Sequence, residues 1–202
     1  MAGCLLSSAN AQTPAGYTTS AGGGILRLGI TVKGKSYWLN ADDTPIRNGQ
    51  LQITAHRLSE SHGVVIAVRN TDLPADAKLA WGYGGCDNDP LETDISPEDC
   101  KDNVFNVEGS LITAYHGEVM RLRFTRLIIP VTSEVRLADA HRQQSPDILF
   151  ESGKATDAPM LCGQTALQKG KTYYFCLYKP GRNADYTYNM LPQMADKPDL
   201  QP

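Results

Sequence analysis

The sequence predicts an all-β protein, an antiparallel β-sandwich with one or two short helical turns. Apolar residues recur mainly at every second position, which is the period of a strand. Turn residues such as Gly and Asn separate these alternating runs. Helical periodicity is sparse, so the chain offers no crossover helices for a parallel sheet. With 202 residues, it has the length of one domain with a sizeable core.

The strands follow one another with short connections. In the first, Leu26, Leu28 and Ile30 share one face. A later segment, GVVIAVRN, is apolar on both faces, as expected of a central strand. The expected strands are residues 25–32, 50–56, 63–70, 78–84, 110–117, 118–129 and 171–180. Residues 110–129 form a hairpin in this interpretation, with His116 and Gly117 at its tip.

Two places favour a helical turn. Ser96 is a good N-cap, Pro97 suits the first helical position, and acidic residues follow in the first turn. This helix must be short, because Val104 and Phe105 already resume a strand pattern. A second, weaker helical pattern covers residues 138–144.

The chain divides into three parts in this interpretation. Residues 1–21 form a signal-like segment and a disordered N-terminus, residues 22–180 the β-sandwich domain, and residues 181–202 a polar tail or linker to a missing domain. Ala9-Asn10-Ala11 resembles a signal-peptide cleavage site, and Cys4 leaves a lipoprotein as the alternative, so we expect export. No run approaches the roughly 20 apolar residues of a membrane span. The net charge of −3 and the scattered basic residues argue against a nucleic-acid partner.

Four cysteines form two pairs with equal spacing, Cys86 with Cys100 and Cys162 with Cys176. In an exported protein, three disulfide connectivities are possible, and local pairing within each pair is the simplest. The alternative is four buried, reduced thiols. A zinc site is not expected, because the chain has no C-x-x-C pair.

An acidic segment between Cys86 and Asp102 raises the question of a metal site. Calcium takes six to eight oxygen ligands, but the spacing here is not that of an EF-hand. The weak candidate ligands are Asp87, Asp89, Glu92 and Asp94. The competing interpretation is a solvated loop. We predict no catalytic residue, since no carboxylate pair has an evident pocket and the four histidines are scattered, with His116 expected to be exposed at a turn.

Aromatic residues supply the candidate ligand contacts. Trp38 lies in an amphipathic segment near an edge, and Tyr83 follows Trp81 on one face of its strand. Both rings are candidates for stacking on a sugar, although Trp81 itself has the pattern of a core residue.

Several stretches, taken in order, are similar to a known family: GGGILRLGI, LQITAHRLSESHGVVIAVRN, LAWGYGG and PEDCKDN. They resemble an uncharacterised bacterial N-terminal β-sandwich domain attached to six-hairpin glycosidase-like secreted proteins, over about residues 22–180. The resemblance implies a supersandwich-like fold that packs against a helical-barrel catalytic domain. It places the catalytic carboxylates in the barrel, so no catalytic residue carries over to this chain.

The expected function is therefore a non-catalytic module of a secreted, glycosidase-like, polysaccharide-degrading system, which supports or rims a carbohydrate site. The expected location is the periplasm or cell surface of a bacterium. The alternative is a freestanding carbohydrate-binding or adhesion domain stabilised by calcium. The expected partners are the helical barrel or carbohydrate.

Overall fold

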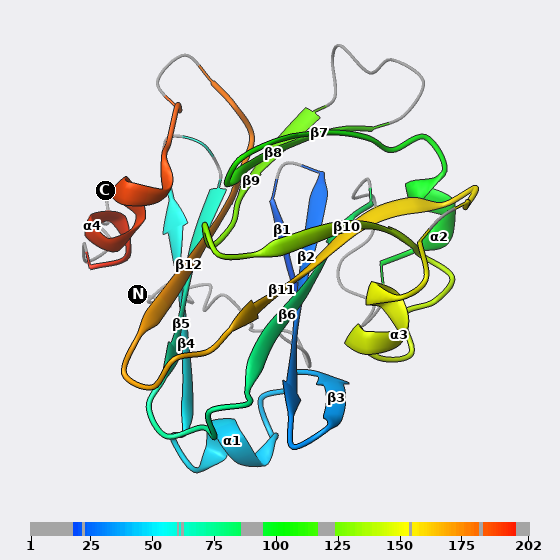
Figure 1. Ribbon diagram of the computed structural model, residues 1–202. Helices are drawn as coiled ribbons and strands as arrows, with labels where there is room; N and C mark the ends of the chain where they lie inside the picture. Colours follow the sequence, from blue (N-terminus) through cyan, green and yellow to red (C-terminus); the bar gives the residue numbers. More distant parts are fainter. Residues whose placement is uncertain are drawn as a thin grey trace, which may run out of the picture.

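The computed structural model describes residues 18–21, 23–59, 61, 63–85, 95–116, 124–153, 155–181 and 184–196. Two six-stranded antiparallel sheets face each other (Figure 1). This confirms the predicted all-β fold and β-sandwich architecture. None of the helices in the described ranges has the length and apolar character needed to cross a membrane.

The first sheet has the strand order β1-β2-β6-β11-β10, with β3 paired to β2. Its strands are β1 (Thr18–Ala21), β2 (Gly24–Val32), β3 (Lys35–Trp38), β6 (Lys78–Gly84), β10 (Glu134–Asp139) and β11 (Pro159–Ala166). Leu28 of β2 lies opposite Trp81 of β6, and Trp81 lies opposite Gly163 of β11. A Cβ atom at position 163 would lie 2.4 Å from the Trp81 ring, so glycine gives that ring its space.

The second sheet has the order β4-β5-β12-β9-β8-β7. Its strands are β4 (Leu51–Leu58), β5 (Gly63–Asn70), β7 (Val104–Glu108), β8 (Leu111–Tyr115), β9 (Phe124–Ile128) and β12 (Thr172–Tyr178). The strand predicted as central, β5, pairs on both sides, with β4 and β12.

Helices are few and short: α1 (Thr44–Arg47), α2 (Pro97–Cys100), α3 (Pro146–Phe150), the 3-10 helix η1 (Tyr188–Met190) and α4 (Leu191–Ala195). Helix α2 confirms the predicted turn after Ser96. The second helical prediction, over residues 138–144, is wrong. Residues up to Asp139 belong to β10, and the helix begins at Pro146, where the Ser145 hydroxyl oxygen accepts a hydrogen bond from the Ile148 amide.

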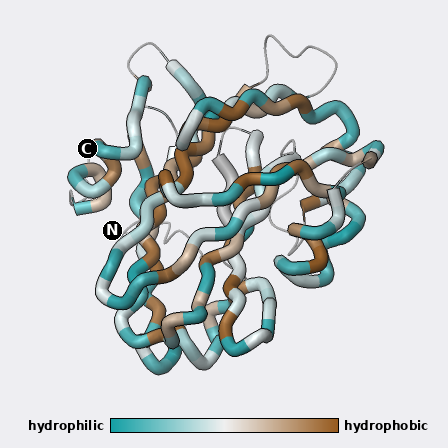
Figure 2. Tube along the Cα trace, viewed as in Figure 1, coloured by the Kyte–Doolittle hydropathy of each residue, from teal (hydrophilic) through white to brown (hydrophobic). Residues whose placement is uncertain are grey.

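The core has three layers, and Figure 2 shows hydrophobic stretches along the strands of both sheets. The predicted alternation places Leu26, Leu28 and Ile30 between the sheets. Helices α2 and α3 lie on the opposite side of the molecule from α4 in Figure 1. Apolar side chains on the outward face of each sheet form a further cluster beside these helices. Both sheets therefore bury both of their faces over much of their area.

Residues 184–196 differ from the expected polar tail. Leu191 is fully buried and, with Ala195, belongs to the cluster on the outer face of the second sheet. The Tyr186 ring lies 4.8 Å from that of Tyr178 on β12. The prediction failed because the apolar residues of this segment, such as Leu191, Met194 and Ala195, are interspersed with polar ones over too short a stretch to show a period.

The predicted pairing of Cys162 with Cys176 is wrong. Cys162 lies in the outer cluster of the first sheet and Cys176 in that of the second, with the central core between them. A disulfide requires Cα atoms within about 7 Å, and both residues are free, buried thiols. Cys100 is also a free, buried thiol, and Cys86, its predicted partner, lies outside the described residues.

Candidate functional site

Four polar side chains form a buried chain of hydrogen bonds at one end of the sandwich. Tyr83 is the last residue but one of β6, and Thr125 is the second residue of β9. His116 follows β8, and Asn103 precedes β7. The Tyr83 hydroxyl lies 2.6 Å from Thr125 Oγ1, which lies 2.9 Å from His116 Nε2. His116 Nδ1 lies 2.9 Å from Asn103 Oδ1. These four residues, the His116 network, link the two sheets.

A backbone carbonyl fixes the direction of every bond in the His116 network. The carbonyl oxygen of Pro159 can only accept, and it lies 3.4 Å from Asn103 Nδ2. Asn103 therefore turns its Oδ1 to His116, so the imidazole carries its hydrogen on Nδ1. His116 Nε2 then accepts from the Thr125 hydroxyl, and the Thr125 oxygen accepts from Tyr83. Each donor has an acceptor only when the imidazole is neutral.

Burial sets the protonation of this network. His116 is 1% exposed, and desolvation lowers its pKa from 6.5 to about 4. Burial also raises the pKa of Tyr83, against a weaker opposing effect of its hydrogen bond to Thr125. At neutral pH both groups are uncharged, and both imidazole nitrogens are engaged. The network is thus suited to holding the fold rather than to transferring protons.

No pattern in the sequence indicated the His116 network. His116 was expected to be exposed at a hairpin tip, yet it is among the most buried polar residues described. Its partners, Asn103 and Thr125, are 13 and 9 positions away, and no spacing rule joins them. The only available signal was that His116, Asn103 and Tyr83 all border strand ends.

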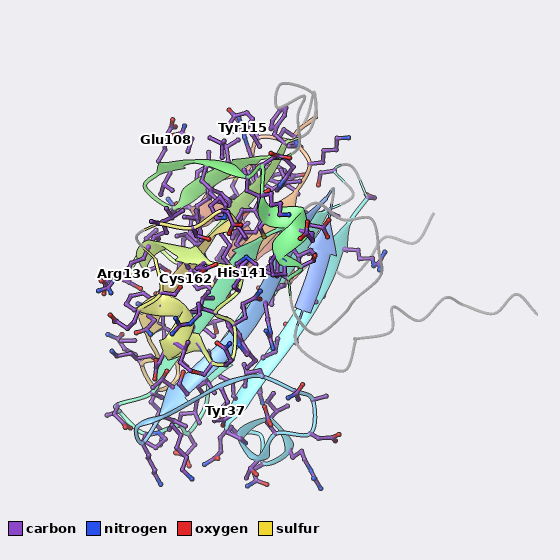
Figure 3. All side chains as sticks on the ribbon, turned by 90° about the vertical axis from the view of Figure 1, so that its right-hand side faces the viewer. Tyr37, Glu108, Tyr115, Arg136, His141 and Cys162 are labelled. Carbon is purple, nitrogen blue, oxygen red and sulfur yellow. The ribbon has the colours of Figure 1, made fainter. Side chains whose placement is uncertain are left out.

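A surface hollow of about 390 Å³ lies beside α2. Its lining residues are Ile95, Ser96, Pro97, Ala140, His141, Gln143 and Gln144. They come from two segments, the approach to α2 and the connection between β10 and α3. His141 lies on the side of the molecule that faces the viewer in Figure 3.

Gln143 joins the two segments that form the hollow. Its Oε1 accepts from the Ile95 amide (3.1 Å), and its Nε2 donates to the carbonyl oxygens of Ile95 (2.6 Å) and Ala140 (2.7 Å). The Trp38 indole N–H donates to the carbonyl oxygen of Gln143 over 2.6 Å. These four bonds fix the floor of the hollow before any ligand arrives.

The hollow combines apolar surface with polar groups. Pro97 and Ala140 supply the apolar surface, and Ser96, His141 and Gln144 supply the polar groups. The His141 side chain is 50% exposed, and its Nε2 lies 3.3 Å from Asp157 Oδ1. Such a surface can pack against the C–H face of a small polar molecule and hydrogen-bond its hydroxyl groups.

The two aromatic ligand candidates lie inside the protein. Trp38 is 8% exposed and supports the hollow from behind, with the Arg27 guanidinium 4.3 Å from its ring centroid. Tyr83 is fully buried in the His116 network. Neither ring presents a face to solvent on which a sugar could stack. Both are amphipathic side chains whose polar atoms found internal partners.

The four candidate calcium ligands, Asp87, Asp89, Glu92 and Asp94, lie outside the described residues. Across the part of the chain that the structure describes, no three His, Cys, Asp or Glu residues are grouped to hold a metal ion.

Together, these features define a β-sandwich domain with a buried hydrogen-bond network at one end and a partly polar, partly apolar hollow beside α2. The chain belongs to the family described as "Domain of unknown function (DUF4450)", which matches residues 40–199. No curated protein matches the chain.

Proposed function

We propose that this protein is a non-catalytic β-sandwich module of a secreted polysaccharide-degrading system and that it contacts carbohydrate through the hollow beside α2. The observation that carries the proposal is the chemistry of that hollow. Its lining offers hydroxyl, imidazole and amide groups beside Pro97 and Ala140. Sugars present the same combination of hydroxyl groups and apolar C–H faces.

Pre-organisation favours this role. Because Gln143 and Trp38 hold the floor through four hydrogen bonds, a ligand would not have to order the two segments on binding. A hollow of about 390 Å³ has room for a small part of a polysaccharide. The module would therefore hold a short stretch of a longer chain.

The acidic groups near the hollow support a non-catalytic role. Hydrolysis by two carboxylates needs one of them to be held protonated, usually by burial. The Glu98 side chain is 76% exposed and lies 2.5 Å from the Lys101 ammonium. The Asp157 side chain is 79% exposed beside His141. Neither side chain has the burial that such a mechanism uses.

The catalytic partner in this proposal is a helical-barrel domain, and the location is the exported space of a bacterium, the periplasm or cell surface. Both rest on the sequence resemblance to domains attached to six-hairpin glycosidase-like proteins. In that arrangement the barrel cleaves the glycosidic bond, and the β-sandwich supports or rims the substrate.

Calorimetric titration of the full chain against a panel of plant and host polysaccharides tests the proposal. We expect binding to at least one of them, weakened at least tenfold when His141 and Gln144 are both replaced by alanine. Gln52→Ala, at an exposed position of β4, is the matched control and should bind as the unmodified protein does. Absence of binding to every polysaccharide, or binding indifferent to the double variant, would contradict the proposed site.

Two further readouts separate the competing functions. Binding that disappears when calcium is chelated would favour the freestanding, calcium-stabilised binding domain. Turnover of aryl glycosides by the purified chain would overturn the non-catalytic assignment. We expect binding without calcium dependence and no turnover.

A further inference from the structure

The His116 network joins parts of the chain that are far apart in sequence. Tyr83 and Asn103 stand on either side of residues 86–94, and His116 and Thr125 on either side of residues 117–123. Their hydrogen bonds run from β6 in the first sheet to β9 in the second. At this end of the sandwich, the contact between the sheets therefore includes a series of hydrogen bonds that is complete only when the His116 imidazole is neutral.

We propose that the His116 network is an acid-sensitive switch, which holds this end of the sandwich closed at neutral pH and releases it when the imidazole is protonated. In the protonated state Nε2 carries a hydrogen and donates to the Thr125 oxygen, so the Thr125 hydroxyl must turn its hydrogen to the Tyr83 oxygen. The Tyr83 hydroxyl hydrogen then loses its acceptor in the network, and a positive charge is buried. Opening hydrates both the charge and the hydroxyl group.

Within the His116 network itself, the imidazole is the member that titrates in acid. Titratable or charged residues on the neighbouring elements are Tyr83 on β6, Asp99 and Cys100 on α2, Asp102 after it, Tyr115 on β8 and Arg126 on β9. Tyr83 and Cys100 have pKa values raised by burial, that of Cys100 to about 12, so both stay neutral in acid. Arg126 points to the opposite face of β9 from Thr125, where its Nη1 lies 3.2 Å from Asp185.

The pH range of the switch follows from linkage. The closed state binds a proton at His116 with a pKa of about 4, and the open, hydrated state with the ordinary 6.5. Acid therefore favours the open state as the pH falls from about 6.5 to about 4. Between pH 7.5 and pH 4.5 the open fraction should rise about 70-fold.

Cys100 reports this opening. It is fully buried, and its carbonyl oxygen accepts from the Asn103 amide over 3.1 Å. A Cβ atom on Gly84, next to Tyr83, would lie 3.3 Å from both Cys100 Sγ and Asn103 Nδ2, so the thiol adjoins the network. Cys176 lies in the cluster on the outer face of the second sheet and serves as the internal control.

The test is labelling of the full chain with 4,4′-dithiodipyridine, which reacts in acid, followed by peptide mapping. The ratio of Cys100 to Cys176 labelling removes the intrinsic pH dependence of the reagent. We expect this ratio to rise about 70-fold between pH 7.5 and pH 4.5. In His116→Gln, where the side chain at position 116 does not titrate, the ratio should stay constant. A constant ratio in the unmodified protein, or an equal rise in His116→Gln, would overturn the proposal.

A second pair of variants keeps the test decisive if His116→Gln does not fold. Thr125→Val removes the hydroxyl that favours the neutral imidazole, which raises the pKa of His116 in the closed state towards 6.5. The labelling ratio should therefore rise by clearly less than about 70-fold between pH 7.5 and pH 4.5. Thr125→Ser keeps the hydroxyl and should show the same rise as the unmodified protein. Equal rises in the two variants would contradict the role of the network.

Discussion

Acid should lower the global stability of this protein through His116. The pKa of His116 is about 4 in the folded protein and 6.5 when unfolded. The unfolded chain therefore binds more protons between these values, so the stabilisation is complete above about pH 6.5 and is lost as the pH falls towards 4. A difference of about 2.5 pKa units, at 1.36 kcal/mol per unit, amounts to roughly 3 kcal/mol. That is a large part of the 5–15 kcal/mol typical of a domain.

Urea unfolding at several pH values between 7.5 and 4.5 measures this effect. Carboxylates also titrate in this range, so the informative quantity is the difference in pH dependence between the unmodified protein and His116→Gln. We expect the unmodified protein to lose roughly 2–3 kcal/mol more than the variant on acidification. His141→Gln is the matched control, because His141 is half exposed, and it should follow the unmodified protein. Parallel pH profiles for the unmodified protein and His116→Gln would refute the reasoning.

Three other predictions concern the hollow, the C-terminal helix and the thiols. Gln143→Ala removes three hydrogen bonds and should destabilise the fold by about 3 kcal/mol in urea unfolding. Gln144→Ala, at the exposed position next to it, is the control and should change stability by less than about 0.5 kcal/mol. Equal effects of the two substitutions would argue against the Gln143 contacts. Leu191→Ala should lower the free energy of unfolding by about 2–5 kcal/mol, because Leu191 is fully buried. An unchanged stability would indicate that residues 184–196 are a linker and not part of the folded domain. Non-reducing peptide mapping should find Cys162 and Cys176 as free thiols, and a peptide that links them would contradict the sheet arrangement.

The strand pattern was predictable because alternation depends on local side-chain direction. Leu26, Leu28 and Ile30 show the period of two directly, and the structure buries all three between the sheets. The strand β11 escaped prediction because residues from Met160 to Gly163 are buried on both faces, so alternation is absent there. Residues 184–196 escaped because apolar residues scattered among polar ones in a short segment show no clear period.

The candidate site depended on contacts between distant segments, and the sequence alone did not show them. Gln143 meets Ile95 across 48 positions, and Trp38 meets Gln143 across 105. The Trp38 ring is amphipathic whether it faces solvent or the interior. The sequence pattern therefore could not distinguish a ring that contacts a ligand from one that supports the hollow from behind. The predicted pairing of Cys162 with Cys176 failed because equal spacing along the sequence carries no information about which sheet each residue joins.

Titration of the ¹⁵N-labelled full chain with oligosaccharides from a bound polysaccharide, followed by amide chemical shifts, tests whether the hollow beside α2 contacts carbohydrate. We predict that the largest changes fall on the two segments of the hollow, residues 95–97 and 140–144, while the amides of β4 stay unchanged. Changes that spare both segments, or no change with any oligosaccharide, would contradict the assignment of the hollow as the carbohydrate contact.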